Sequence, residues 1–225
     1  SIKENADFYA SFENSPFGLK LILKLCFNNL DFELKTFSRY LASNIICSMA
    51  VLILDGIKLS EISKIAKDIA LPQGRLEKII KNQQVIYIDY AHTPEALECT
   101  LKELNNIHNE TIWCLFGCGG NRDRDKRPLM GKIAQKYSNH VILTNDNPRD
   151  EDEMDIINDI LSEMQQTEEI SINLDRKDAI ESSILEMERN HIKGVLLIAG
   201  KGHENYQEIN DNLYELNDRN IVNSL

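Results

Sequence analysis

Long apolar runs are absent from this chain of 225 residues. The stretch 19–27 is mostly apolar, but Lys20 and Lys24 interrupt it, and it is far shorter than the roughly 20 residues that cross a bilayer. No segment has the pattern of a signal peptide. Basic residues are also too few, since 25 of them face 36 acidic residues, for a formal net charge of −11. Because nucleic acids and anionic membranes attract concentrated positive charge, we expect neither as a partner.

Cysteine is sparse, with five residues and no CxxC pair. A metal site built on Cys114 and Cys118 would need further soft ligands at a compatible spacing, and the sequence offers none. We therefore expect no metal site. The odd number favours reduced thiols over disulfides, which predicts a cytoplasmic protein.

A nucleotide-binding P-loop of the form GxxxxGK[ST] is missing. Residues 194–202 resemble one superficially, but their spacing is wrong. The glycines at 117, 119 and 120 also fail the dinucleotide pattern GxGxxG, because Arg122 stands at its last position. The chain begins at Ser1 without an opening strand-loop-helix unit. We therefore expect a piece of a longer protein, unable to bind a triphosphate through a P-loop of its own.

The first third of the chain predicts short strands over residues 6–37, with turn signals at 14–16 and 28–29. Apolar residues at helical spacing then predict a helix over 40–56 that stops at Gly56. A second helix is predicted to follow, capped by Ser60. Its expected buried residues are Ile62, Ile65, Ala66 and Ile69.

From about residue 84, apolar strands alternate with helices. Strands are predicted at 85–88, 112–116, 141–143, 172–174 and 195–198. Helices are expected after Thr93, near 152–164, and after Asp175. Alternation of this kind predicts an α/β fold with a mostly parallel sheet and helices on both faces.

Polar and glycine-rich segments follow four of these strands, and ligands of such sheets bind beyond the carboxyl ends of the strands. Arg122 and Arg149 offer planar forks that suit carboxylates, while Asp146 and Glu204 offer acceptors that suit an ammonium group. Together they would suit a zwitterionic amino acid. The alternative is a set of surface ion pairs, each worth about 0–1 kcal/mol. The segments occupy residues 89–92, 117–123, 145–149 and 200–204.

Two further features of the sequence each allow two interpretations. The glycines of 117–120 could admit an anionic group to the backbone, or form a tight turn that positions Arg122. The acidic run 150–153 is better explained by the N-terminal end of a helix, where carboxylates complement the helix dipole, than by a metal site.

Five motifs occur in order: DYAHTP at 89–94, GCGGNRD at 117–123, KRPLMG at 126–131, DNPR at 146–149 and AGKGHE at 199–204. In order and spacing they resemble the signatures of the UDP-N-acetylmuramoyl-tripeptide synthetases, the Mur ligases that add meso-diaminopimelate. The resemblance covers the whole chain, since Asn44 and Gly74-Arg75 also fall at the family's spacing. The chain departs from the usual GxFNxxN before Asn44, where Ser38, Tyr40 and Leu41 stand.

The resemblance implies that residues 1–78 are the end of a central ATPase domain whose P-loop half is missing. Residues 79–225 would be the Rossmann-like domain that brings the amino acid. The implied reaction uses ATP and Mg²⁺ to form an acyl phosphate on UDP-N-acetylmuramoyl-L-alanyl-D-glutamate, which the amine of meso-diaminopimelate attacks. We expect no ligase activity from this chain alone. The missing upstream portions of the same chain are expected partners.

The residues that match the family's sites follow from the same resemblance. Arg149 would pair with the distal carboxylate that lysine lacks, so the choice of substrate depends on it. The matching diaminopimelate positions are Arg122, Asp146, Asn147, Pro148, Arg149, Gly200 and Glu204. The matching ATP positions are Asn44, by the adenine, Arg75, by the phosphates, Asp89, by the ribose, and His92. No catalytic residue is assigned.

Three alternatives stay open. One is a lysine-adding Mur ligase, and another is a different amide ligase of the superfamily, such as a folylpolyglutamate synthetase. Arg149 and the AGKGHE segment argue against both. The third is a non-catalytic module that binds an amino acid, and a P-loop in the upstream coding sequence would argue against it.

Overall fold

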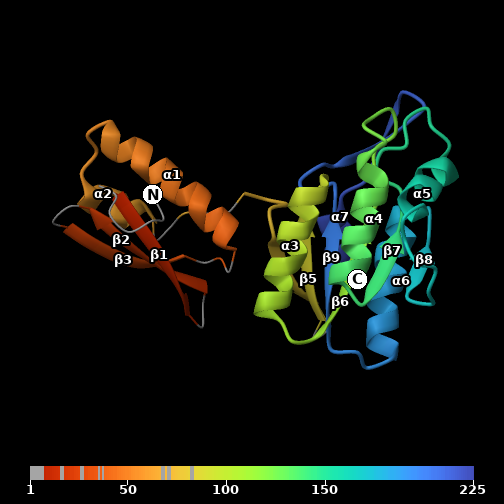
Figure 1. The fold of residues 1–225 in the computed structure, drawn as a ribbon, viewed down its shortest axis with the longest axis horizontal. Helices are drawn as coiled ribbons and strands as arrows, with labels where there is room; N and C mark the ends of the chain where they lie inside the picture. The colour runs from red at the N-terminus through yellow and green to blue at the C-terminus, as the bar shows by residue number, and fades with distance from the viewer. Residues whose placement is uncertain are drawn as a thin grey trace. The chain divides into compact units, whose positions relative to one another are not determined.

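The computed structural model describes residues 8–15, 18–25, 28–34, 36, 38–66, 69, 72–81 and 84–225. Pro16, Cys26 and the side chain of Ala66 lie outside the described part, and so do the predictions that concern them. The chain forms two compact units, Ser1–Leu71 and Pro72–Leu225, which are red to orange and yellow to blue in Figure 1. The predicted domain boundary after residue 78 lies within β4 (Glu77–Lys81), whereas the two compact units divide between Leu71 and Pro72.

The first unit contains the expected short strands, β1 (Phe8–Ser15), β2 (Gly18–Leu25) and β3 (Asn28–Leu34), in one antiparallel sheet. The 28–29 pair opens β3 instead of forming a turn. Leu19 and Leu21 of β2 are buried, as alternation along a half-buried strand requires. Lys20 between them lies opposite Glu13 and Glu33 of the neighbouring strands, an arrangement that favours this register.

Two helices complete this unit. Helix α1 (Arg39–Leu54) begins after Ser38, whose hydroxyl accepts from the Leu41 amide. It ends before Gly56, whose φ of +87° confirms the predicted stop. Helix α2 (Leu59–Ala66) already includes Ser60, so the predicted cap is wrong by position. Ile62 is buried as expected, but Ile65 is 62% exposed, and the prediction that it faces the core is wrong.

The second unit is built on a six-stranded sheet with the order β4-β5-β9-β6-β7-β8. All neighbours are parallel except β4 and β5. The strands are β4 (Glu77–Lys81), β5 (Gln84–Asp89), β6 (Thr111–Phe116), β7 (His140–Leu143), β8 (Ile170–Ile172) and β9 (Gly194–Ala199). Every residue of β9 is buried, as expected for a strand covered on both faces.

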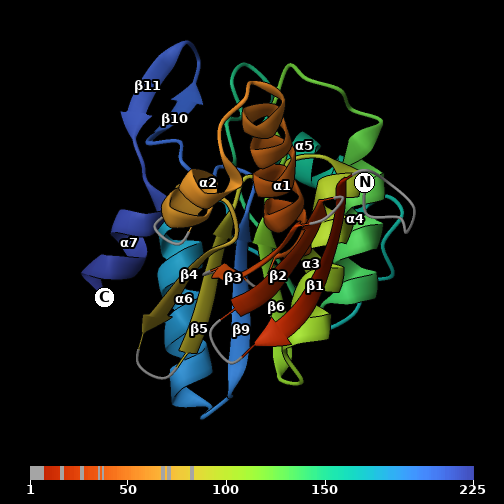
Figure 2. The same cartoon turned by 90° about the vertical axis from the view of Figure 1, so that its left-hand side faces the viewer.

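Helices cover both faces of this sheet, which confirms the predicted fold class (Figure 2). Helices α6 (Arg176–Arg189) and α7 (Asp218–Ser224) close a core that includes Ile86, Trp113 and Leu196. Helices α3 (Pro94–Ile107), α4 (Lys126–Tyr137) and α5 (Glu153–Leu161) cover the opposite face. Among the described helices, none is long and apolar enough to traverse a bilayer.

The predicted caps Thr93 and Asp175 both accept from amides of the first turns of their helices, and the structure adds Asp152 as the cap of α5. Strand β8 lies two residues before its predicted position at 172–174. Other elements were not predicted at all. These are β4, α4, α7 and the hairpin of β10 (Tyr206–Ile209) and β11 (Asn212–Glu215).

Candidate functional site

The loops that follow β5, β6, β7 and β9 leave the same edge of the sheet, because these strands are parallel and adjacent. Backbone hydrogen bonds tie them together. The Gly200 amide donates to the Asp89 carbonyl at 3.1 Å, and the Gly120 amide donates to the Asn147 carbonyl at 2.9 Å. The loops therefore converge at one edge of the sheet. This convergence was predicted from the positions of the strand ends in the sequence.

The glycines after β6 allow two loops to touch. A Cβ atom on Gly117 would lie 2.1 Å from the Thr144 carbonyl oxygen, and one on Gly120 would lie 1.9 Å from the Pro148 carbonyl oxygen. Since the Gly120 amide donates to Asn147, it is not offered to an anion. Of the two interpretations left open, the geometry at Gly117 and Gly120 favours the tight turn.

A buried amide and two opposite charges form the centre of the loop cluster. Lys201 is fully buried, and its ammonium donates to Asn147 Oδ1 at 3.0 Å and to Glu204 Oε2 at 3.1 Å. Asn147 Nδ2 donates to the same Glu204 oxygen at 3.1 Å. The Glu208 amide also donates to Asn147 Oδ1, at 2.9 Å. Because Oδ1 receives two donors, the orientation of the Asn147 amide is determined. Lys201 was not among the predicted site residues.

Arg149 adopts a left-handed backbone with φ of +53°, which is uncommon outside glycine. Its Nη1 donates to the Gly120 carbonyl at 2.8 Å, and its Nε lies 2.8 Å from Glu208 Oε2. Together with Pro148, Arg149 lines a groove of about 500 Å³ that also includes residues 150–154, Leu174, Ile209 and Asn210. The guanidinium is therefore held by protein groups at the rim of a groove.

Asp146 and Gly200 face each other across the ends of β7 and β9. Asp146 is 9% exposed, and its Oδ2 would lie 2.7 Å from a Cβ atom on Gly200, whose φ is +109°. Only glycine therefore leaves room for this carboxylate. The Asp146 carbonyl accepts from Gln207 Nε2 at 2.8 Å, so β10 also supports the loop.

Arg122 is exposed next to Gly119, with its Cγ 3.5 Å from where a Gly119 Cβ would lie. Arg149 Nη1 lies 3.1 Å from the same point, so the two predicted arginines flank one glycine. Arg122 forms no hydrogen bond or ion pair with the residues that the structure describes. Its side chain is thus available to a ligand in this part of the site.

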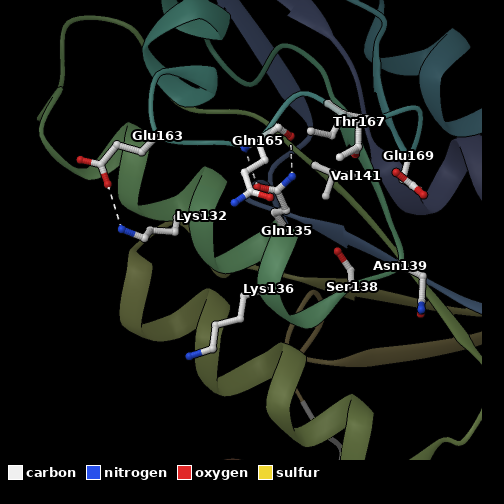
Figure 3. A pocket seen from close by; sticks show the side chains of 11 residues that line it. Lys132, Gln135, Lys136, Ser138, Asn139, Val141, Glu163, Gln165, Thr167 and Glu169 are labelled. Carbon is white, nitrogen blue, oxygen red and sulfur yellow. Dashed lines mark hydrogen bonds and ion pairs between the residues drawn. The ribbon is translucent and has the colours of Figure 1, made fainter.

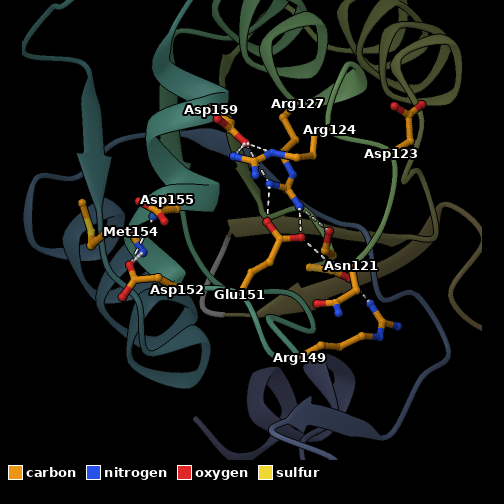
Figure 4. Close-up of polar contacts among 12 residues, drawn as sticks. Asn121, Asp123, Arg124, Arg127, Arg149, Glu151, Asp152, Met154, Asp155 and Asp159 are labelled. Carbon is orange, nitrogen blue, oxygen red and sulfur yellow. Dashed lines mark hydrogen bonds and ion pairs between the residues drawn. The ribbon is translucent and has the colours of Figure 1, made fainter.

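A third arginine, Arg127, holds the glycine turn through hydrogen bonds (Figure 4). Arg127 is fully buried and donates to both carboxylate oxygens of Glu151, at 2.8 and 2.9 Å. It also reaches Asp159 at 2.8 Å and the Gly119 carbonyl at 3.1 Å. Glu151 in turn accepts from the amide of Asn121. The network joins the glycine turn to α5, and the sequence did not predict it.

The hydrogen bonds from Arg127 lower the pKa of Glu151 from 4.5 to about 2. The folded state therefore favours the ionised carboxylate, and this stability is fully present above about pH 4.5 and lost as the pH falls through about 2. We predict that Glu151→Gln lowers the free energy of unfolding at neutral pH, and that the difference from wild type closes between these values. Denaturant titrations followed by Trp113 fluorescence measure it, with the exposed Glu168→Gln as control. A difference that stays constant with pH would contradict the role of Glu151.

The acidic run does stand at the start of a helix. Asp152 caps α5 by accepting from the amides of Met154 and Asp155 (Figure 4). Asp150 accepts from Asn121 Nδ2 at 3.2 Å. Among the described residues, no group of three or more His, Cys, Asp or Glu side chains is arranged to hold a metal ion.

Three of the four residues assigned to ATP gather around Tyr90. The Arg75 guanidinium carbon lies 4.8 Å above the Tyr90 ring, and the His92 ring centroid lies 4.6 Å from it. Asp89 is buried, and its carboxylate accepts from the Leu76 amide at 2.7 Å and from Thr100 Oγ1 at 3.3 Å. Both of its carboxylate oxygens thus already have protein donors.

This cluster adjoins the one around Asn147. A Cβ atom on Gly202 would lie 2.8 Å from the Tyr90 Cβ, so the loop after β9 packs against Tyr90. Burial and then the charges of Glu204 and Asp146 raise the pKa of Tyr90. The His203 ring centroid lies 5.2 Å from the Tyr90 ring. Asn44, the fourth residue assigned to ATP, is exposed on α1 of the first unit, where its carbonyl accepts from Ser48 Oγ.

A second groove of about 480 Å³ is shown in Figure 3. It lies where β7 and β8 begin, at the edge of the sheet opposite the loop cluster. Several of its polar side chains already have partners within the protein. Lys132 pairs with Glu163 at 3.3 Å, and Gln135 exchanges hydrogen bonds with the backbone of Gln165. None of the predicted site residues lines this groove.

Comparisons with known proteins found similar sequences and structures. The family model described as Mur ligase, glutamate ligase domain, matches residues 74–202. A curated UDP-N-acetylmuramoyl-L-alanyl-D-glutamate--2,6-diaminopimelate ligase of Prochlorococcus marinus is 39% identical over 210 residues, covering 92% of this chain and 41% of that protein. Its namesake of Buchnera aphidicola is 44% identical over 189 residues, covering 83% and 37%.

A solved structure titled as the same kind of ligase has a TM-score of 0.66 and 33% identity. The matched region covers 99% of this chain and 45% of the chain in that structure. The chain thus spans about two fifths of the length of the curated relatives named here, 41% and 37%. Because the solved structure covers 99% of this chain, the similarity extends over both of its units.

Proposed function

Since the chain belongs to the Mur ligase family, we propose that it is the carboxyl-terminal part of an ATP-dependent ligase that joins meso-diaminopimelate to UDP-N-acetylmuramoyl-L-alanyl-D-glutamate. The names of its relatives support this reaction. It would be a cytoplasmic step in the synthesis of peptidoglycan precursors. In this proposal the second unit binds the amino acid and presents its amine.

The charges at the loop cluster suit an amino acid with two acidic ends. Asp146 and Glu204 supply carboxylates for an ammonium group, while Arg122 and Arg149 supply guanidinium groups for carboxylates. Asn147 lies between them, with its amide orientation held by Lys201 and the Glu208 backbone. Gly200 contributes by leaving room for Asp146, and Pro148 by restricting the turn that leads to Arg149.

Arg149 is the observation that carries the choice of substrate. A guanidinium at the rim of a groove can pair with the distal carboxylate of diaminopimelate, which lysine lacks. Its Nη2 makes no hydrogen bond to the described residues, so this nitrogen can receive the carboxylate. The amine at the other end of the substrate would then be oriented by the acidic side chains, and such positioning lowers the barrier for attack.

ATP and Mg²⁺ belong to the proposal as well. When bound, ATP supplies the phosphoryl group that activates the carboxylate of the UDP-linked peptide. Arg75 fits a phosphate contact, because its half-buried guanidinium lies over Tyr90 without a carboxylate partner among the described residues. Asp89 fits a ribose contact less well, since protein donors already occupy it, and we assign it to supporting the backbone at Leu76. Asn44 and His92 stay predictions.

Arg149→Ala in the full-length parent tests the substrate assignment. We expect kcat/KM for diaminopimelate to fall by roughly 30-fold, or about 2 kcal/mol, because the distal carboxylate loses its charged partner. The residual activity with lysine should change little, since lysine has no carboxylate there. Steady-state kinetics with both amino acids measures the effect.

Arg189→Ala is the matched control, because Arg189 is exposed in the last turn of α6, far along the helix from the loops. It should leave both substrates unaffected. Equal losses for diaminopimelate and lysine in the Arg149 variant would point to a general structural role. Unchanged use of diaminopimelate would overturn the substrate assignment.

A further inference from the structure

The β10–β11 hairpin forms one side of the loop cluster. No sequence motif indicated this hairpin. Strand β10 runs beside residues 146–149. The Arg149 amide donates to the Glu208 carbonyl at 3.0 Å, and the Asn210 amide donates to the Arg149 carbonyl at 3.1 Å. An isolated bridge also pairs Arg149 with Ile209. The backbone of Arg149 is therefore bound to the hairpin on both sides.

The side chain of Arg149 is held by the same strand. Glu208 Oε2 lies 2.8 Å from Arg149 Nε, and these side chains are only 27% and 17% exposed. Because the Gly120 carbonyl accepts from Nη1, the guanidinium is fixed at two of its three nitrogens. The third, Nη2, makes no hydrogen bond within the described part of the chain.

We propose that Glu208 is a specificity-determining positioning residue. It holds Arg149 by the Nε edge and so leaves Nη2 for the substrate. The inference rests on the proposed function, in which Arg149 receives the distal carboxylate of diaminopimelate. Glu208 itself does not touch the substrate. Without it, Arg149 would have to be ordered anew at each binding event, which weakens binding.

Charge alone suggests the opposite outcome. The Glu208 carboxylate partly neutralises Arg149, and its removal would strengthen the attraction of the guanidinium for an anion. Positioning is favoured because the two fixed contacts come from separate segments, strand β10 and the loop after β6, and leave one nitrogen open. An arginine donates to a carboxylate with defined geometry, so its orientation decides whether the substrate fits.

The test compares Glu208→Ala and Glu208→Gln in the full-length parent, with Glu215→Ala as control. Glu215 lies on the exposed strand of the same hairpin, opposite Tyr206. We expect Glu208→Ala to raise KM for diaminopimelate about tenfold while kcat stays within about twofold, because binding and not chemistry is affected. Glu208→Gln keeps an acceptor for Nε and should recover most of the loss. The control should match wild type.

The preference for diaminopimelate over lysine should fall in parallel with the KM effect. An unchanged or lower KM in Glu208→Ala would overturn the role of Glu208, and so would a failure of Glu208→Gln to recover it. Either result leaves the proposed function standing if Arg149→Ala still loses diaminopimelate use. If the proposed function itself is wrong, the Arg149→Ala variant will instead use diaminopimelate normally.

Discussion

Asp218→Ala should lower the free energy of unfolding of the second unit by about 3–5 kcal/mol, because it leaves a buried guanidinium without its counter-charge. The side chains of Arg176 and Asp218 are both fully buried. Two parallel hydrogen bonds join them, from Nε to Oδ1 at 2.9 Å and from Nη2 to Oδ2 at 2.8 Å. Few ion pairs in the described part of the chain are so completely removed from water.

The same guanidinium also bonds to the backbone at the edge of the sheet. Arg176 donates to the Asn145 carbonyl at 3.3 Å and to the Ala199 carbonyl at 3.0 Å, which lie where β7 and β9 end. Loss of Asp218 should therefore disturb the loop cluster as well as α7. The double variant Arg176→Met/Asp218→Leu removes both charges, and it should recover much of the stability that the single variant loses.

Trp113 makes the measurement specific to this unit, since it is the only tryptophan of the chain and is 3% exposed on β6. Its fluorescence during urea unfolding reports the second unit alone. Asp125→Ala is the control, because Asp125 also lies at the N-terminal end of a helix but is exposed and makes no cap hydrogen bond. If Asp218→Ala and Asp125→Ala lower the free energy of unfolding by the same amount, the buried pair does not stabilise the unit.

The central strands could be predicted from the sequence because they are buried on both faces. Each is a short apolar run, and helix caps such as Thr93 and Asp175 mark where the intervening helices begin. Parallel connection then brings the loops to one edge, so the convergence of residues 146–149 with 200–204 could also be predicted.

Elements without an apolar pattern could not be predicted. All four residues of β11 are exposed, and β4 alternates only between half-buried and exposed positions. Helix α4 contains Gly131, which lowers helical propensity but lets α4 approach α5, since a Cβ there would lie 2.3 Å from the Ile160 carbonyl oxygen. Helix α7 opens with Asp218, a charged residue that is buried only because a partner 42 residues away neutralises it.

The functional site likewise contains residues that could be predicted from the sequence and residues that could not. Arg149, Asn147 and Glu204 belong to motifs at strand ends, and the fold brings them within reach of one another. The groups that hold them, Lys201 and Glu208, act through contacts that depend on the packed structure. A lysine between two glycines indicates an exposed loop, and nothing in its neighbourhood predicts complete burial.

Lys201→Met should lower the free energy of unfolding by about 3 kcal/mol, the lower end of the range for a broken buried pair, because solvent can reach Glu204 in part. Methionine is similar in length to lysine and fills the space, so the loss reports the missing charge and not a cavity. Asn147 Oδ1 would keep only the Glu208 amide as a donor. The Glu204 carboxylate, 20% exposed, would lose its cation.

Lys177→Met is the matched control, since Lys177 is 63% exposed and lies 3.9 Å from Glu181, a surface pair worth about 0–1 kcal/mol. Glu204→Gln provides the second arm of a double-mutant cycle. Alone, it leaves the Lys201 ammonium buried without a counter-charge, whereas in combination with Lys201→Met no unpaired charge is left. The double variant should therefore cost less than the sum of the single variants, by about 1 kcal/mol or more. Strict additivity would mean that Lys201 and Glu204 do not act as a pair, and that the orientation of Asn147 has another cause.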